Sequence, residues 1–241
     1  MPARVTLGML AVAAAGLAFP GSAAPAEAAG DPARGRRLYE TGCSSCHDLE
    51  GRGTRLGPPL AGVGAAAADF YLSTGRMPLD EPRAVAERKP PAYSPAEIAD
   101  LTAYVASLGP GPPIPVVRPE AGDLAVGGQS YTANCAACHN SAGSGGALGQ
   151  AVFAPGVRQA TPVQIAEAIR TGPGAMPVFG PDTLDDHDVD SIVRYLLYLR
   201  EADDRGGAPL GRLGPVPEGL VAWLVGLGPM LGAAFWIGTR Q

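Results

Sequence analysis

Two copies of a five-residue pattern constrain this chain more than any other feature. The 241 residues contain four cysteines and three histidines, and all four cysteines and two of the histidines lie in Cys43-Ser-Ser-Cys46-His47 and Cys135-Ala-Ala-Cys138-His139. Cys-x-x-Cys-His is the attachment pattern of c-type haem, in which two thiols form thioethers and the adjacent imidazole binds the iron. The sequence therefore predicts two covalently bound haem c groups. Their predicted attachment residues are Cys43, Cys46, Cys135 and Cys138, with His47 and His139 as axial iron ligands.

Zinc sites and disulfides are the alternatives for such cysteine pairs. Zinc ribbons separate their two pairs by roughly 15–20 residues, whereas the second pair here begins 92 positions after the first. Zinc also leaves the histidine after each pair unexplained. Disulfides persist in exported proteins, but Cys-x-x-Cys bonds are more often redox-active than structural. Haem attachment is the interpretation we favour.

The methionines suggest the second axial ligand of each iron. Met1 and Met9 lie in an N-terminal apolar segment and Met230 in a C-terminal one, which leaves Met77 and Met176. These two occupy matching places, in TGRMP and TGPGAMP, after a predicted helix in each half of the chain. A thioether opposite histidine is the ligation of electron-carrying cytochromes c. We expect Met77 and Met176 to bind iron; the alternative is that they fill gaps in a core.

Two prolines and one histidine have a less specific signal. Pro58 follows His47, and Pro155 follows His139, in rigid loops whose carbonyls can accept a hydrogen bond from the axial imidazole. We expect this role for both, against the alternative of ordinary turns. His187 lies among acids, where an exposed place in the first turn of a helix is the simplest interpretation and a ligand or proton role is the rival.

The other local signals predict helices. Asp31, Ser94 and Thr161 each precede a proline, as a capping residue does before the first helical position. Thr183 is expected to open the last helix of the second half. No segment alternates between apolar and polar residues over a sustained run. The predicted fold class is all-α, with two tandem cytochrome c-like haem domains and a C-terminal transmembrane helix.

Composition shifts place the predicted boundaries. The segment 109–115 is rich in glycine and proline and cannot continue a helix, so it separates the two halves. A second such segment precedes the C-terminal apolar run. We therefore divide the chain into a signal peptide (or retained N-terminal anchor) at 1–29, domain 1 at 30–110, a linker at 111–121, domain 2 at 122–205, a linker at 206–218 and a transmembrane helix at 219–238.

The two ends predict export and anchoring. An apolar run of fifteen residues, 5–19, is short for a membrane span but fits a signal peptide. The run 219–238 has twenty residues without a charge, enough for a helix to cross the hydrocarbon core, and Trp223 and Trp236 lie near its ends. We expect a cell-membrane protein with one C-terminal pass and its haem domains on the extracytoplasmic side.

Charge excludes one class of partner. The formal net charge of −5 argues against nucleic-acid binding, which needs a basic stripe. Acids gather in the second half, at Asp182, Asp185, Asp186, Asp188 and Asp190. They either steer a basic partner toward that half or form a solvated helix start.

These motifs together resemble one family. The segments GCSSCH, GPPLAGVGAAAADFYLSTGRMP, YVASLGPGPPIP, NCAACHNSAGSGGALG, TGPGAMPVFG and GLVAWLVGLGPMLGAAFWIG are similar to the dihaem cytochrome c subunit of the actinobacterial menaquinol–cytochrome c reductase, the cytochrome bcc complex. The likeness covers nearly the whole chain and includes every predicted ligand position.

The resemblance implies a place in a respiratory complex. Its partners would be a cytochrome b subunit, a Rieske iron–sulfur subunit and a terminal cytochrome c oxidase. The chain would serve as the electron-transfer subunit of an oxidoreductase, and its partners would perform the bond-making and proton chemistry. The rivals are a free-standing membrane-anchored dihaem shuttle and a dihaem peroxidase, which would need one iron with an open or displaceable ligand.

Overall fold

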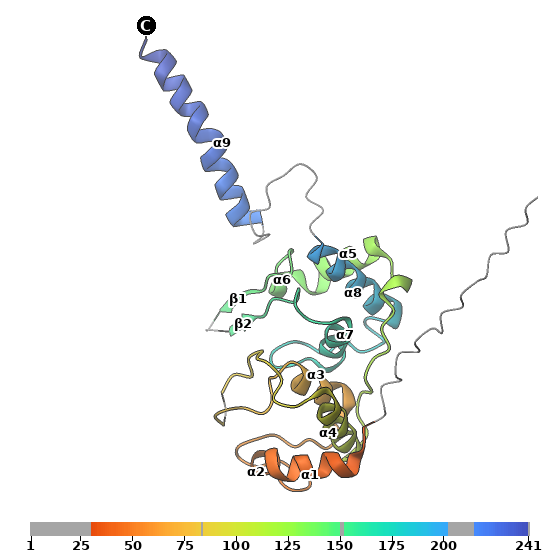
Figure 1. The fold of residues 1–241 in the computed structure, drawn as a ribbon. Coiled ribbons are helices and arrows are strands. Elements are labelled where there is room, and N and C mark those ends of the chain that lie inside the picture. Colours follow the sequence, from red (N-terminus) through yellow and green to blue (C-terminus); the bar gives the residue numbers. More distant parts are fainter. Residues whose placement is uncertain (1–29, 83, 150–151, 202–214, 241) are drawn as a thin grey trace, which may run out of the picture.

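The computed structural model describes residues 30–82, 84–149, 152–201 and 215–240. The predicted signal peptide 1–29 and most of the predicted linker 206–218 lie outside the described residues. The described part is mostly helical, in two domains followed by one long helix (Figure 1). Its elements are α1 (Pro32–Gly42), α2 (Ser44–His47), α3 (Gly64–Ser73), α4 (Pro95–Ser107), a 3₁₀ turn η1 (Pro119–Ala121), α5 (Leu124–Asn134), α6 (Ala136–His139), β1 (Gly146–Gly149), β2 (Val152–Ala154), α7 (Pro162–Thr171), α8 (Asp186–Arg200) and α9 (Pro215–Gly238).

The predicted helix starts are confirmed, with one exception. The Asp31 side chain accepts a hydrogen bond from the Ala33 amide, and capping boxes at Ser94 and Thr161 open α4 and α7. The prediction that Thr183 opens the last helix of domain 2 was wrong. Asp185 caps α8 instead, because it exchanges side-chain and backbone hydrogen bonds with Asp188 three residues on.

Each domain is built on a crossing of its first and last helices. In domain 1, α1 packs against α4, and an added Cβ at Gly35 would lie 1.9 Å from the backbone oxygen of Asp100. In domain 2, α5 packs against α8, and a Cβ at Gly127 would lie 2.0 Å from the backbone oxygen of Ser191. Only glycine permits backbones to approach this closely. The two halves therefore repeat one plan, as their motifs predict.

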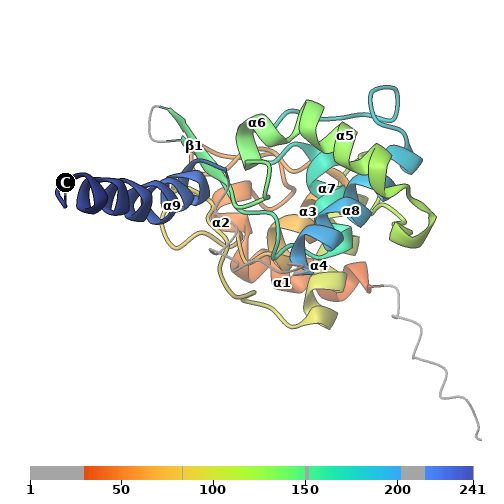
Figure 2. The same cartoon turned by 90° about the horizontal axis from the view of Figure 1, so that it is seen from above.

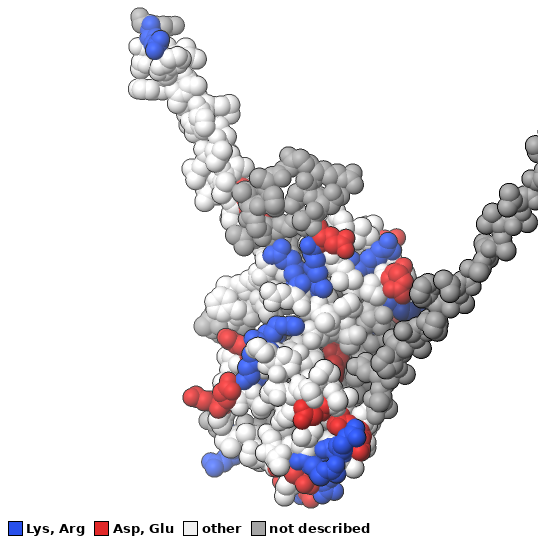
Figure 3. Space-filling view, in the orientation of Figure 1, with Lys and Arg blue, Asp and Glu red and all other residues white. Residues whose placement is uncertain are grey.

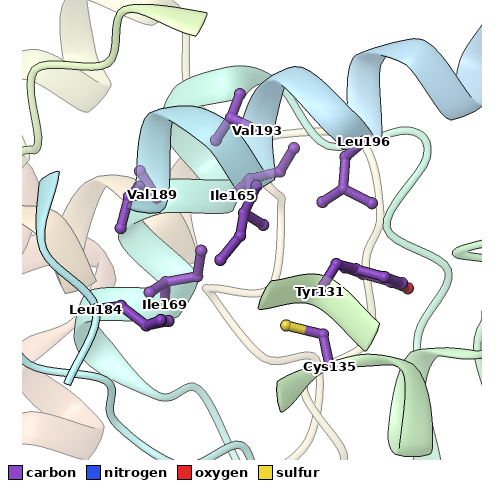
Figure 4. Close-up of a cluster of buried hydrophobic side chains, with 10 residues drawn as sticks. Tyr131, Cys135, Ile165, Ile169, Leu184, Val189, Val193 and Leu196 are labelled. Carbon is purple, nitrogen blue, oxygen red and sulfur yellow. The ribbon is translucent and has the colours of Figure 1, made fainter. Parts of the chain in front are cut away.

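Tyrosines occupy the centre of both crossings. Tyr39 and Tyr131 are fully buried, and their rings lie 5.0 Å from Tyr104 and 5.6 Å from Tyr195, respectively. Each of the two tyrosines belongs to the buried cluster of its own domain. Figure 4 shows the cluster of domain 2, whose members come from α5, α7, α8 and the adjoining loops.

The structure adds one element that the sequence analysis does not predict. β1 and β2 pair antiparallel in a short hairpin that follows α6, with a register irregularity between Ala147 and Gly149. Strands of four and three residues are too short to show a period of two. The fold is therefore mostly helical with a small hairpin.

The two domains meet through α3 and α7. These helices lie side by side between the domains in both ribbon views (Figures 1 and 2). Gln164 of α7 donates a hydrogen bond to the Ser73 hydroxyl at 3.1 Å and accepts one from Arg88, also at 3.1 Å. Both helices lead directly into the segments that carry Met77 and Met176, so this contact joins the two methionine loops.

The C-terminal helix α9 stands clear of the rest of the described chain. Its stretch Val216–Gly238 is long and apolar enough to cross a membrane, with a mean hydropathy of 1.9, and none of it is buried. Figure 3 shows a surface without charge between the two ends of this helix. Pro229 lies inside it, and Arg240 stacks on the Trp236 ring 4.2 Å from its centroid.

Candidate haem-binding sites

Each Cys-x-x-Cys-His frame forms the corner after the first helix of its domain. The Cys43 amide donates to the Tyr39 carbonyl at the end of α1, and the chain then turns into the single helical turn α2. The Cys135 amide donates to the Tyr131 carbonyl, and α6 follows in the same way. In both frames the helical turn places the two cysteines and the histidine within one short segment beside the core.

The histidines of the two frames make the same contact. His47 Nδ1 lies 2.8 Å from the carbonyl oxygen of Pro58, and His139 Nδ1 lies 2.8 Å from that of Pro155. A carbonyl only accepts hydrogen bonds, so Nδ1 carries the proton and donates it. Nε2 then keeps its lone pair for a metal ion, and the ring orientation is set by the loop. Pro58 and Pro155 thus contact His47 and His139, respectively, as the sequence predicts.

Two buried tyrosines support the turn after each histidine, a role that the sequence analysis missed. The hydroxyl of Tyr39 donates to the Asp48 carbonyl at 2.8 Å, and that of Tyr131 donates to the Asn140 carbonyl at 2.7 Å. Asp48 and Asn140 have positive φ angles of 69° and 68°. The signal in the sequence is the tyrosine that stands four residues before the first cysteine of each frame.

The methionines lie against the same cores as the frames. Met77 and Cys43 both pack on the buried cluster of domain 1, and Met176 and Cys135 belong to the corresponding region of domain 2. Figure 4 shows the sulfur of Cys135 on the side of the cluster where Ile165 and Ile169 lie. Both methionines are half-buried, so each thioether is available at the edge of its core.

Exposed apolar side chains border both candidate sites. Leu49 and Leu56 follow His47 and precede Pro58, while Phe153 and Val178 lie two residues from Pro155 and Met176; the four are 46–71% exposed. Large apolar side chains gathered at a surface normally mark a binding region. A flat apolar macrocycle such as haem suits a border of this kind.

The first thiol of each frame lacks the thiolate character of a redox-active cysteine. None of the four cysteines forms a disulfide. Burial raises the pKa of the Cys43 thiol to about 11, and burial likewise raises the pKa of Cys135 to about 11. Redox-active cysteines need the opposite shift, toward the thiolate. Among the described residues, no group of three or more His, Cys, Asp or Glu is placed to hold a metal ion.

His187 and its acidic neighbours form a helix start. His187 is exposed in the first turn of α8. Asp185 and Asp188 form the capping box of this helix. Asp186 forms an ion pair with Arg170 at 2.7 Å. The buried Asp190 accepts a hydrogen bond from the Arg118 backbone amide. Figure 3 shows acids and bases interspersed on the visible face of the domains. These contacts favour the structural interpretation of the acidic cluster over a steering role.

Comparison with family models assigns each half separately. Residues 32–109 match the model "Cytochrome c", and residues 122–196 match "Cytochrome C oxidase, cbb3-type, subunit III". The two matches fall within the two domains of the fold.

Curated relatives cover nearly the whole chain. The "Cytochrome bc1 complex cytochrome c subunit" of Mycobacterium tuberculosis is 40% identical over 217 residues, which is 86% of this chain and 77% of the relative. The protein of the same description from Corynebacterium diphtheriae is 37% identical over 225 residues, 86% of this chain and 80% of the relative. A solved structure described as the Kuenenia stuttgartiensis reducing HAO-like protein complex has a TM-score of 0.39 at 16% identity, covering 70% of this chain and 96% of that chain.

Proposed function

The chain belongs to the family of cytochrome c subunits of the cytochrome bc1 complex, and from this premise we propose that it carries electrons from a Rieske iron–sulfur centre of a menaquinol–cytochrome c reductase toward a terminal oxidase. Its two cytochrome c domains make it an electron carrier. The proposed enzyme is the whole reductase, in which this chain is the electron-transfer subunit and performs no bond chemistry of its own.

Two covalently bound haem c groups are the proposed cofactors. Cys43 and Cys46 attach the first haem, and Cys135 and Cys138 attach the second. His47 and Met77 are the proposed axial ligands in domain 1, and His139 and Met176 are those in domain 2. When bound, such a group supplies one-electron redox chemistry at its iron. The chain contributes the attachment, the ligands and the burial that tune the potential.

One observation carries this proposal: the same histidine–proline contact, at 2.8 Å, beside each cysteine pair. The Pro58 and Pro155 carbonyls hold the proton of each imidazole on Nδ1, which makes Nε2 a better donor to iron. Because the loops fix both rings before any electron arrives, little rearrangement is needed on reduction. A repeated site of this kind suits repeated electron transfer.

The described contacts do not favour a free-standing electron shuttle over a subunit of a complex. They disfavour the third candidate, a dihaem peroxidase. Each domain has a methionine beside its core at the same place in the repeat. A peroxidase would need one of these positions to lack a ligand or to release it. The equivalence of the two domains supports two electron-carrying sites.

The apolar helix α9 supports a membrane location. Its 23-residue stretch Val216–Gly238 is long and apolar enough to cross the hydrocarbon core. Trp223 and Trp236 near its ends would lie at the two interfaces. We propose that the haem domains face the extracytoplasmic side, because the predicted N-terminal signal and Arg240 in the C-terminal tail favour the same orientation.

Purification in mild detergent from native membranes tests the proposed partners. We expect a cytochrome b subunit, a Rieske subunit and a terminal oxidase to co-purify with the tagged full-length chain. A matched chain that ends before α9 should be recovered in the soluble fraction, which separates anchoring from assembly. Recovery of the full-length chain alone, with both haems in place, would leave the shuttle as the function and contradict the complex.

A further inference from the structure

Two acidic side chains meet where the domains join. Asp69 lies on α3 and Glu167 lies on α7, the helices that form the interdomain contact. Glu167 is completely buried, and among the described residues no hydrogen-bond partner of ordinary geometry satisfies its two carboxyl oxygens. Burying a charged carboxylate without a compensating cation costs free energy. The fold therefore has to accommodate this pair either with both groups charged or with a proton on one of them.

The cations near this junction are engaged elsewhere. On α7, Arg170 bonds Asp186 and the carbonyls of Phe179 and Leu184. Arg88, in the segment before α4, donates to Gln164. Arg76, which lies over the Phe70 ring of α3, donates to the Ala86 carbonyl. On α8, Arg194 donates a hydrogen bond to the Gly122 carbonyl. The neighbouring acid Asp190 accepts a hydrogen bond from the Arg118 backbone amide.

Burial and Asp69 act on Glu167 in the same direction. Burial raises the pKa of Glu167 first, and the charge of Asp69 and the contact with its carboxyl raise it further, to about 9. The neutral acid is therefore the form that the fold favours at neutral pH. Protonation would make Glu167 a hydrogen-bond donor, and the Asp69 carboxylate across the interface would be its acceptor.

A small cavity gives this pair access to solvent. It is lined by residues of both domains, among them Asp69 and Ser73 of α3, Tyr93, and Gln164 of α7. Protons can reach Asp69 from this side without separation of the helices. The site is thus buried enough to retain a proton and open enough to exchange it.

We propose that Asp69 and Glu167 form a proton-binding site between the two domains, in which one proton is held at neutral pH and supports the α3–α7 contact. Proton loss would leave two carboxylates facing each other in a desolvated interface. The ligand of this site is the proton, which the solvent supplies and receives. The inference concerns the protein alone and does not depend on the electron route proposed above.

The sign of the pH dependence follows from the raised pKa. The stabilising contribution of Glu167 is fully present below its unfolded-state pKa of about 4.5 and is lost as pH rises through the folded-state pKa of about 9. Between these limits the native state holds one more proton than the unfolded state. The folding equilibrium constant should fall about tenfold per pH unit relative to a variant without this group.

Urea unfolding of the full-length holoprotein with Glu167→Gln, compared with wild type from about pH 5 to about pH 10, tests the site. Glutamine is neutral at every pH and can still donate to Asp69. We expect the stability advantage of the variant to grow with pH and to level off near pH 9. In an Asp69→Asn background, the stability difference should stop growing at a lower pH, because this substitution removes the charge that raises the pKa of Glu167. Glu120→Gln, on the exposed turn η1, is the matched control and should add no pH-dependent difference.

Infrared spectroscopy of the same proteins provides a second readout that does not require unfolding. We expect a protonated carboxyl band in wild type at neutral pH that disappears at alkaline pH and is absent from Glu167→Gln. A constant stability difference across the pH range, with no such band, would show that Glu167 is ionised in the native state. A difference that appears only after chelation with EDTA would assign the site to a metal ion. Either result would overturn the proposal.

Discussion

Replacement of Cys135 and Cys138 with serine is expected to halve the haem content, from two groups per chain to one. These cysteines are the proposed attachment points in domain 2, and the Cys43 and Cys46 thiols remain for domain 1. Serine cannot form the thioethers, so haem in domain 2 would depend on axial ligation alone. Pyridine haemochrome analysis of the denatured, washed protein measures the covalent content directly.

The same substitution should destabilise domain 2 selectively. Cys135 belongs to its buried cluster, and a domain of about 80 residues has a small core that often needs a staple or cofactor for stability. We expect much of the helical signal from α5, α7 and α8 to be lost, while domain 1 remains folded. The matched variant Cys43→Ser with Cys46→Ser should give the reverse pattern. A haem content that stays near two, or that falls equally in both domains, would contradict separate attachment.

Met176→Ala is the second change with a large expected effect. It removes the proposed thioether ligand of domain 2 and leaves the His139–Pro155 contact intact. One of the two irons should change from low spin to high spin, with loss of the thioether-to-iron charge-transfer band in absorbance. Its potential should fall on the order of a few tenths of a volt, because axial ligation sets haem potentials over about 0.8 V.

Two other methionine variants complete this experiment. Met77→Ala should produce the same change in the other haem, since Met77 is at the equivalent place in domain 1. Met230→Ala, on the exposed surface of α9, should leave both spectra unchanged. Retention of two low-spin spectra in Met176→Ala would disprove ligation by Met176 and make His187 the next residue to substitute.

Much of this architecture is readable from the sequence because its signals are local. The capping residues at Asp31, Ser94 and Thr161 lie next to the helices they begin. The apolar C-terminal run needs no partner to be recognised. The Pro58 and Pro155 contacts were also predictable, since each loop returns to its own histidine within eleven and sixteen positions, respectively.

The features that escaped prediction depend on weak or long-range signals. The strands β1 and β2 of the hairpin are too short to show the two-residue alternation of apolar and polar side chains that marks a strand. Thr183 and Asp185 are both acceptable caps, and only the reciprocal bonds with Asp188 decide between them. Asp69 and Glu167 come from different domains, so their meeting could not be inferred before the packing of α3 on α7 was known.

The domain interface gives the two sites a common support. α3 and α7 are each followed by a methionine segment, and Gln164 links them to Ser73 and Arg88. A carrier with two irons needs them at a constant separation, because electron transfer slows steeply with distance. The proton held by Asp69 and Glu167 would then contribute to the spacing as well as to stability.

Single-turnover reduction of the detergent-purified complex by menaquinol tests most directly whether this chain lies on the electron path. The haem c bands and the oxidase bands are followed together in one stopped-flow experiment. The account predicts that both haems of this chain become reduced before the oxidase and at least as fast as steady-state turnover. Reduction of the oxidase while both haems remain oxidised would contradict it.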